Sequence, residues 1–340
     1  MPQTVPQAER VLPQSMTPAI TPVFAEYKPP ANGVTYGIAF GHDNAVWFTQ
    51  HNSYVGRYNG SFSSVHVNLP QPVFVQNGTK PILAALSSGV YGGVEYYESG
   101  GFYAQENIYK ITYAHTVSTT SGSEQALQGS TMQAIAAGTS DVYATGSYIE
   151  LGPPGCNSCL YVISNTGASA VRTQNYEAGE AIAYIGGYLY VAAAQNYGNG
   201  AQHGVRIYKI NATTLSGFSL VASLSAPSNI NFMTEGPDGA LWFTDNGRNA
   251  IGRYAPGSLH EYTIPTANAQ PVGIARGLDG ALWFAEAQVN RIGRITTTGA
   301  ITQYNLPFAG GHPTGLVAAP TTHTLWFTDT GTGKIGRVLY

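Results

Sequence analysis

Short stretches of alternating apolar and polar residues recur along this chain, separated by turn residues, and they predict β-strands. In the clearest stretch, PVGIARG (271–277) and ALWFAE (281–286) flank Asp279-Gly280, a dipeptide that favours a tight hairpin. NRIGRI (290–295) and ITQYNLP (301–307) continue as a third and a fourth strand, and Pro307 ends the last one. The unit is therefore a small antiparallel sheet of four strands.

The same unit returns along the chain with one tryptophan per clear copy: Trp47, Trp242, Trp283 and Trp326. Trp242 and Trp283 are 41 residues apart, and Trp283 and Trp326 are 43 apart. Periods of about 40 to 50 residues with several short strands each are typical of β-propeller blades. Three weaker copies fill the 195 residues between Trp47 and Trp242, with tyrosine in the place of tryptophan: Tyr91, Tyr143 and Tyr190. The sequence predicts an all-β propeller of seven four-stranded antiparallel blades.

The two ends of the chain predict how the ring closes. The last copy stops at Tyr340 after its third strand, whereas FAEYKPP (24–30) resembles the outer strands LHEYTIP and ITQYNLP. We expect this N-terminal strand to complete the seventh blade, which removes two open sheet edges. Residues 24–340 then form a single propeller domain. Residues 1–23 contain five prolines and no strand or helix period, so we expect a flexible tail.

Composition narrows the classes of function. Only 10% of the 340 residues are charged, the net charge is −3 and there are 15 Lys and Arg, so neither nucleic-acid binding nor charge-driven disorder is expected. No apolar run approaches the roughly 20 residues of a membrane span. The low charge and the 23 tyrosines favour a monomeric, extracytoplasmic (periplasmic or secreted) protein whose signal has been removed. A cytosolic start is the alternative.

Propeller geometry brings the start of each first strand and the end of each second strand to one mouth of the central channel. The residues predicted to start the first strands are Tyr36, Ile82, Gln133, Glu180, Asn231, Val272 and Thr314. The residues predicted to end the second strands in the regular blades are Gln50, Asp245, Glu286 and Asp329. Because polar groups gather there, this mouth is the predicted site for a small molecule or a peptide. Protein partners would contact the loops of blades two to four.

The predicted binding residues at this mouth are Tyr36, Gln50, His51, Gln133, Glu180, Asn231 and Thr314. A hard cation, Mg²⁺ or Ca²⁺, takes oxygen ligands, and the candidate ligands are Glu180, Asp245, Glu286 and Asp329. The alternative for the acidic trio is structural: each carboxylate pairs with a repeated arginine (Arg253, Arg294 or Arg337) or accepts backbone N–H groups. The glycines and arginines of the repeated Gly-Arg pairs, and the tryptophans, are expected to make structural contacts between blades.

Cys156 and Cys159 are the only cysteines, in the inserted segment GPPGCNSC of blade three. A zinc site would need a second pair of ligands nearby, and none is visible. A small disulfide that closes this insertion suits an exported protein. Two free thiols are the alternative.

The strings P-x-G-I, D-G-x-L-W-F-T-E/D and N-x-I-G-R-I resemble the virginiamycin B lyase (streptogramin lyase) family, most specifically in blades one, five, six and seven. The resemblance implies a seven-bladed propeller. It also implies a magnesium-assisted, non-hydrolytic opening of the ester in a cyclic depsipeptide antibiotic. In that family, histidines that start the first strands of the last two blades act as bases, and nearby glutamates bind magnesium.

This chain departs from the family pattern at the positions that carry the chemistry. Val272 and Thr314 stand where the resemblance implies the two histidines, and neither is a base near neutral pH. His312, two residues before Thr314, stands where the family has a metal-binding glutamate, so His312 and Glu286 are the candidate catalytic residues. A ligand-binding or scaffolding propeller is the favoured interpretation. The alternative is a metal-dependent enzyme, either a lactone or ester hydrolase or a C–O lyase of the family type.

Overall fold

The computed structural model describes residues 20–30, 33–50, 54–67, 83–97, 104–119, 130–148, 158–164, 167–172, 177–195 and 204–340. In these ranges the chain forms strands β1 to β28 and one short 3-10 helix, η1 (Ala287–Val289). None of the described residues belongs to a helix long and apolar enough to cross a membrane. The predicted tail lies outside the described residues up to residue 19, so its flexibility stays a prediction.

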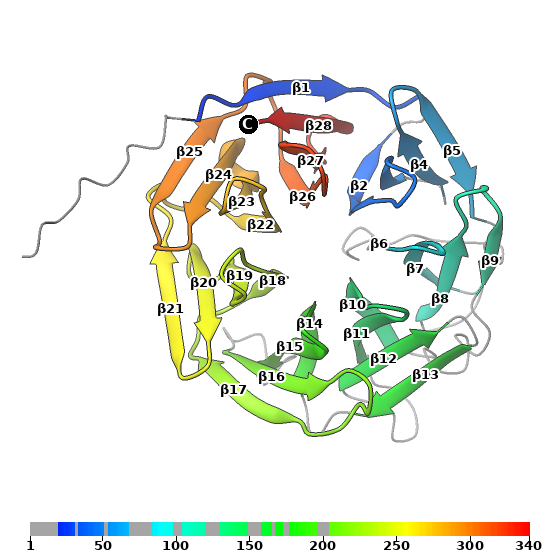
Figure 1. Ribbon diagram of the computed structural model, residues 1–340, viewed down its shortest axis with the longest axis vertical. Coiled ribbons are helices and arrows are strands. Elements are labelled where there is room, and N and C mark those ends of the chain that lie inside the picture. Colours follow the sequence, from blue (N-terminus) through cyan, green and yellow to red (C-terminus); the bar gives the residue numbers. More distant parts are fainter. Residues whose placement is uncertain are drawn as a thin grey trace, which may run out of the picture.

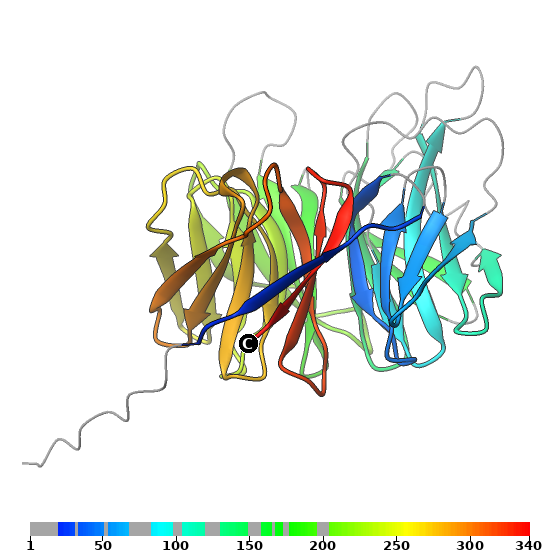
Figure 2. The same cartoon turned by 90° about the horizontal axis from the view of Figure 1, so that it is seen from above.

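The described strands form seven antiparallel sheets of four strands each, set around a common axis (Figure 1). In blades one to six the strands follow chain order from the centre outward, so the first strand of each blade lies nearest the axis. The side view shows strands that run between the two faces of a disk (Figure 2). This confirms the predicted seven-bladed propeller.

Blade one follows the regular repeat, and blades two to four are the degenerate copies. Blade one consists of β2 (Val34–Phe40), β3 (Val46–Gln50), β4 (Tyr54–Tyr58) and β5 (Phe62–His66). Blade two consists of β6 (Leu83–Leu86), β7 (Gly89–Tyr97), β8 (Ala104–Ile111) and β9 (Val117–Thr119). Blade three consists of β10 (Ser130–Ala137), β11 (Val142–Tyr148), β12 (Ser158–Ser164) and β13 (Gly167–Arg172). Blade four consists of β14 (Glu177–Ile185), β15 (Tyr188–Gln195), β16 (Val205–Asn211) and β17 (Ser219–Leu224).

The last three blades follow the regular repeat, as blade one does. Blade five consists of β18 (Ile230–Glu235), β19 (Leu241–Asp245), β20 (Ala250–Ala255) and β21 (Ser258–Thr263). Blade six consists of β22 (Pro271–Arg276), β23 (Ala281–Glu286), β24 (Arg291–Thr296) and β25 (Ile301–Asn305). Blade seven consists of β26 (Pro313–Ala318), β27 (Thr324–Asp329) and β28 (Lys334–Leu339), with β1 (Val23–Tyr27) as its outer strand. β1 pairs antiparallel with β28, from Val23 opposite Leu339 to Tyr27 opposite Ile335.

Strand register shows that the weak copies are true equivalents of the strong ones. In every blade a small or β-branched residue of the first strand lies opposite an aromatic residue of the second. The pairs are Ala39–Trp47, Ala84–Tyr91, Ala136–Tyr143, Ala183–Tyr190, Thr234–Trp242, Ala275–Trp283 and Val317–Trp326. The tyrosines therefore occupy the tryptophan position, as the sequence predicted.

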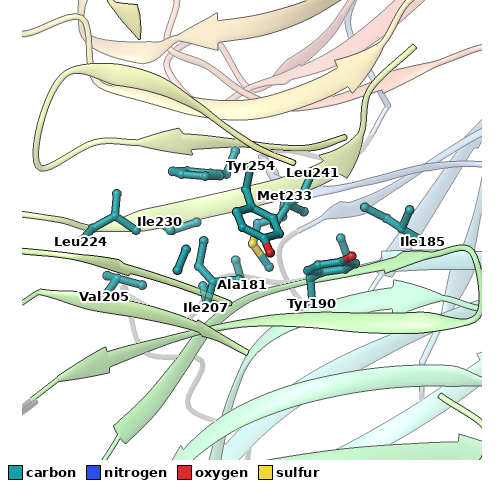
Figure 3. Packing of buried hydrophobic residues seen from close by; sticks show 14 residues of the cluster. Ala181, Ile185, Tyr190, Val205, Ile207, Leu224, Ile230, Met233, Leu241 and Tyr254 are labelled. Atoms are coloured by element: carbon teal, nitrogen blue, oxygen red, sulfur yellow. The ribbon is translucent and has the colours of Figure 1, made fainter. Parts of the chain in front are cut away.

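Apolar side chains between neighbouring blades form the core. Trp47 packs with Leu83 of blade two, Trp242 with Ile274 of blade six, and Trp326 with Val46 of blade one. The tryptophans thus make the predicted contacts between blades. Figure 3 shows the same arrangement between blades four and five, where Tyr190 and Tyr254 lie over an aliphatic cluster.

The repeated Gly-Arg pairs act inside a blade, which corrects the expectation of contacts between blades. Arg294 binds the hairpin residue Asp279 at 2.7 Å and lies over the Trp283 ring at 5.9 Å. Asp279 also accepts a hydrogen bond from the Trp283 indole. The preceding Gly293 leaves room for Phe284, because a Cβ at Gly293 would lie 2.2 Å from that ring. The cluster joins the β22–β23 hairpin to β23 and β24 of one sheet.

Candidate functional site

Strand register brings the predicted residues to one mouth of the channel. In the regular blades, the starts of the first strands lie opposite the ends of the second strands: Val34–Gln50, Ile230–Asp245, Pro271–Glu286 and Pro313–Asp329. Contacts between blades agree with this, because the Asn231 amide donates to the Pro271 carbonyl oxygen of the next blade at 3.3 Å. We call this end of the channel the polar mouth.

The first strands carry a structural feature that the sequence did not predict. Their pairing with the second strands is interrupted between Val34 and Ile38, Met132 and Ala134, Gly179 and Ala181, Ile230 and Met233, Pro271 and Ile274, and Pro313 and Leu316. The predicted first-strand residues of these six blades all lie inside the interruptions, which are β-bulges or similar irregularities. β-Bulges redirect side chains and are common next to functional sites.

A threonine hydroxyl replaces the missing ladder bond in three of these irregularities. The backbone N–H groups of Gly37, Phe232 and Gly315 donate to the hydroxyls of Thr49, Thr244 and Thr328, at 3.2, 3.2 and 2.9 Å. These threonines are the T of the repeated W-F-T string. In blade six the equivalent residue is Ala285, so this substitute bond is missing there. In blades one, five and seven the second strand therefore supports the irregularity of the first.

The side chains at the polar mouth differ in how much of their surface is exposed to solvent. Gln133 and Asn231 are half-buried, whereas Gln50 and Thr314 are buried. The Thr314 hydroxyl lies 3.0 Å from that of Thr328. The side chain of Tyr36 and the whole of His51 lie outside the described part of the chain, so their predicted roles stay predictions.

Glu180 links two blades. It is 7% exposed, and its Oε2 accepts a hydrogen bond from the backbone N–H of Ile230 at 3.0 Å. Ile230 starts β18 and lies opposite Asp245. Glu180 is therefore close to the acidic end of blade five, but one of its oxygens is already committed to the neighbouring blade.

Asp245 and Asp329 organise the loops around them. Asp245 accepts the Ser228 hydroxyl at 2.6 Å and the backbone N–H groups of Asn229 and Arg248 at 2.9 and 3.2 Å. Oδ1 of Asp329 accepts three backbone N–H groups between 2.9 and 3.1 Å: those of His312, Gly331 and Thr332. Both carboxylates are fully buried. Of the two structural roles expected from sequence, acceptance of backbone N–H groups is thus observed.

The other structural role, pairing of the acidic trio with the repeated arginines, is wrong. Arg253 and Arg294 instead bind the hairpin residues Asp238 and Asp279, each at 2.7 Å. Those hairpins follow the first strands, at the opposite end of the sheet from the polar mouth. Among the described residues, Arg337 has no carboxylate partner, and its buried Nε makes no hydrogen bond.

Glu286 is fully buried within blade six. Its Oε2 accepts a hydrogen bond from Gln303 of the outer strand at 2.6 Å, and its buried Oε1 has no hydrogen-bond partner in the described structure. Burial raises the pKa of Glu286, more than the Gln303 hydrogen bond and the Arg291 charge lower it. His312, its proposed catalytic partner, is exposed. A substrate would not touch Glu286 as it is placed here.

Blade seven repeats this arrangement with one change. Glu26 of β1 lies opposite Gly336, the position that Gln303 takes opposite Gly293 in blade six. The Glu26 side chain is 5% exposed and accepts a hydrogen bond from Lys334 at 2.6 Å. Glu26 Oε1 and Asp329 Oδ2 are both buried without a hydrogen-bond partner in the described structure. Where blade six pairs an amide with a carboxylate, blade seven brings two carboxyl groups together.

The predicted metal site is not assembled. No group of three or more His, Cys, Asp or Glu side chains in the described ranges is close enough to hold a metal ion. Asp245, Glu286 and Asp329 belong to three separate hydrogen-bond networks, and Glu180 to the contact between blades four and five. The residues present therefore do not fit the magnesium site that the family resemblance implies. Cys156 lies outside the described residues, as does the side chain of Cys159, and the disulfide stays a prediction.

A cavity among the described residues lies in the other half of the channel. Its volume is about 410 Å³, and its walls are the last residues of the first strands, such as Ile38, Ile135, Ile182 and Met233. Glu235 and Thr234 are the polar residues in the wall. The sequence prediction missed this half because it considered only where first strands begin. The residues that follow each irregularity along the first strand indicate this half of the channel.

Comparison with known proteins supports the family resemblance. Residues 200–340 match the model of the virginiamycin B lyase family. No curated protein sequence matches the chain.

Three solved structures share the fold. Selenomethionine-substituted virginiamycin B lyase from Staphylococcus aureus has a TM-score of 0.71 at 23% identity, over 94% of this chain and 100% of that chain. A catalytically inactive variant of that lyase with quinupristin gives 0.69 at 22% identity, with the same coverage. The β-propeller domain of Cps50 (Swd1) from Myceliophteria thermophila gives 0.63 at 10%, again over 94% and 100%. Residues 200–340 of this protein therefore match the virginiamycin B lyase family, and its described residues carry the seven-bladed propeller fold.

Proposed function

We propose that this protein binds a peptide-like molecule at the polar mouth and does not cleave it. The observation that carries the proposal is the irregularity at the start of the first strand, which occurs in six blades and contains the predicted polar residues. Side-chain amides such as those of Gln133 and Asn231, which are half-buried, can pair with peptide N–H and C=O groups in both directions. A propeller scaffold that holds such groups on fixed strands suits ligand binding.

Two features support binding without catalysis. Val272 and Thr314, the residues at the positions of the implied histidines, are 8% and 2% exposed and offer no base. The nearby carboxylates already accept hydrogen bonds from groups of their own blade or of a neighbouring blade. General-base catalysis needs a group within hydrogen-bond reach of the proton that it removes. His312 is an exposed base near this mouth, but its candidate catalytic partner, Glu286, is fully buried.

Quinupristin, present in one of the similar structures, is the sharpest probe of the proposal. We expect calorimetry to detect quinupristin binding to the full chain, while mass spectrometry finds the ring intact. Asn231→Ala and Gln133→Ala should each weaken binding about threefold or more, since each removes one hydrogen bond worth about 0.5–1.5 kcal/mol. Glu235→Gln, in the other half of the channel, is the matched control and should change nothing. No binding at millimolar quinupristin, or a linear product, contradicts the proposal.

A metal-dependent enzyme is the second candidate, either a lactone or ester hydrolase or a C–O lyase. Glu286 favours it, because a raised pKa and an oxygen without a partner are typical of acid–base groups. A calorimetric titration with Mg²⁺ and Ca²⁺ discriminates between the candidates. One ion bound per chain, with binding lost in Glu180→Gln, supports the enzyme. No heat at millimolar metal supports the binding protein.

We also propose an extracytoplasmic location and a monomeric state. The low charge and the tyrosine-rich composition support the location. Fractionation of cells that express the native chain tests the location, and light scattering tests the monomer. A cytosolic fraction or a dimer would contradict these points without affecting the binding site.

A further inference from the structure

The cavity in the far half of the channel has an unusual wall for a water-accessible space. Fourteen of the 16 residues that line its volume of about 410 Å³ are aliphatic or aromatic. Several of them, including Ile38, Phe40, Ile135 and Tyr184, are only half-buried, so apolar surface faces the channel. Exposed apolar surface concentrated in one concave place marks a binding site more often than scattered exposed residues do.

The repeat explains why space exists there. In every blade except blade six, the small or β-branched residue opposite the aromatic side chain belongs to the cavity wall, as Ala39, Ala84, Ala136 and Ala183 do. The aromatic side chain fills the interface between blades, while its small partner on the first strand leaves the channel open. In blades one, three, four and five, the next residue along the first strand lies at the rim of the cavity. Phe40, Ala137, Tyr184 and Glu235 occupy that rim position.

Glu235 is the one charged residue in the wall of the cavity. It is half-buried, and within the described ranges its side chain has no hydrogen bond or ion pair. Arg276 occupies the same rim position on the next blade, but it is exposed, does not line the cavity and forms no ion pair with Glu235. An unpaired carboxylate at the edge of an apolar space attracts a cation whose body is apolar.

We propose that the far half of the channel binds a small apolar molecule that carries a primary amine, with the ammonium group on Glu235 and the apolar body along Ile135, Ile182 and Met233. The volume lies within the range of about 300–1,000 Å³ typical of small-molecule sites. The body fits one aromatic ring with a short alkyl chain. The site lies at the opposite end of the first strands from the polar mouth, so it does not depend on the function proposed there.

Three probes of equal size separate charge from shape: phenylbutylamine, phenylbutanol and phenylbutyrate. We expect calorimetry at neutral pH to show the amine binding most tightly, then the alcohol, with the carboxylate weakest. Glu235→Gln should weaken the amine about tenfold, because a charge-assisted hydrogen bond contributes about 1.5–3 kcal/mol, and should leave the alcohol within twofold. Arg276→Gln should strengthen amine binding, since it removes the positive charge at the same rim position on the next blade.

Ala137→Phe tests the shape of the site with little risk to the fold. Phe40 and Tyr184 already place aromatic rings at the same rim position on blades one and four, so the fold accommodates one there. The added ring should weaken the amine and the alcohol alike, while the thermal unfolding midpoint stays near that of the unmodified chain. Asn231→Ala, at the polar mouth, should leave all three probes unaffected.

Equal affinity for the amine and the alcohol, or an amine affinity unchanged in both Glu235→Gln and Ala137→Phe, overturns the proposal. Failure of quinupristin to bind would overturn only the function proposed for the polar mouth. The two sites are therefore tested separately on the same protein.

Discussion

The Oε2 atom of Glu180 accepts a hydrogen bond from the backbone N–H of Ile230 at 3.0 Å, so a side chain of blade four holds the first residue of blade five. Ile230 in turn lies opposite Asp245, whose carboxylate holds Ser228 and Asn229. The carboxylates near the polar mouth thus connect neighbouring blades and loops. Substitution of these carboxylates should therefore lower the stability of the folded protein.

Glu180→Ala should destabilise the protein by about 1–3 kcal/mol, because it leaves a buried N–H without an acceptor. Glu180→Gln keeps an amide oxygen for Ile230 and should cost clearly less. Urea denaturation of both variants measures the difference. Equal stability of Glu180→Ala and the unmodified chain would show that the contact is not needed.

The carboxyl pair of blade seven predicts a pH dependence. Burial raises the pKa of Glu26 above its ordinary value of 4.5, more than Lys334 lowers it, and Asp329 raises it further. The folded protein therefore holds this proton better than the unfolded chain does. The resulting stabilisation is complete below pH 4.5, and it is lost as the pH rises through the raised pKa of folded Glu26.

Glu26→Gln should remove that pH dependence and raise stability above this window by about 0.5–1.5 kcal/mol, since its amide donates to Asp329 as Gln303 donates to Glu286. The reciprocal Gln303→Glu should destabilise blade six by about 1–3 kcal/mol and give it a similar pH dependence. Thermal unfolding between pH 4 and pH 8 tests both variants. Parallel pH profiles for Glu26→Gln and the unmodified chain contradict the prediction.

Removal of β1 should open blade seven. A chain that begins at Lys28 lacks the ladder to β28, the Glu26–Lys334 ion pair and the packing of Phe24 in the last blade. We expect a loss of several kcal/mol, because each lost hydrogen bond contributes about 1 kcal/mol. A chain that begins at Ile20 is the reference. Equal melting temperatures of the two chains would show that β1 does not contribute to stability.

The arginines of blades six and seven form a matched pair. Arg294→Met leaves Asp279, whose side chain is 10% exposed, without its ion-pair partner. Arg337 has no carboxylate partner among the described residues, so Arg337→Met leaves no carboxylate unpaired. Thr322 stands four residues before Trp326, where the other three tryptophan blades have Asp. Arg294→Met should cost about 1–2 kcal/mol more than Arg337→Met, in line with the penalty for an unpaired buried group. Chemical denaturation of the two variants measures this difference, and equal losses refute it.

The fold could be predicted because its signal repeats. Four tryptophans fix the period, and small residues opposite Tyr91, Tyr143 and Tyr190 confirm the three weak blades. Register also places the starts of the first strands opposite the ends of the second strands in the regular blades. Because a β-propeller repeats the same backbone arrangement, the strands of one clearly recognised blade predict those of the others.

The chemistry at individual positions was harder to predict, because side-chain partners vary among the blades. Asp245, Glu286 and Asp329 align in sequence, yet each has a different set of donors. Alignment could not show that Arg253 and Arg294 bind hairpin aspartates instead. The bulges also escaped prediction, since an interruption in pairing leaves no distinct mark in the alternation of one strand.

The pairing of β1 with β28 sets the order in which the protein can be completed during synthesis. β1 precedes the other described strands along the chain and β28 follows them, so blade seven stays unfinished until β28 has been synthesised. Blades one to six can assemble meanwhile by contacts with their neighbours. A stalled or prematurely terminated chain would therefore expose the unpaired edge of β1. Quality-control proteases could recognise the incomplete product by this exposed edge.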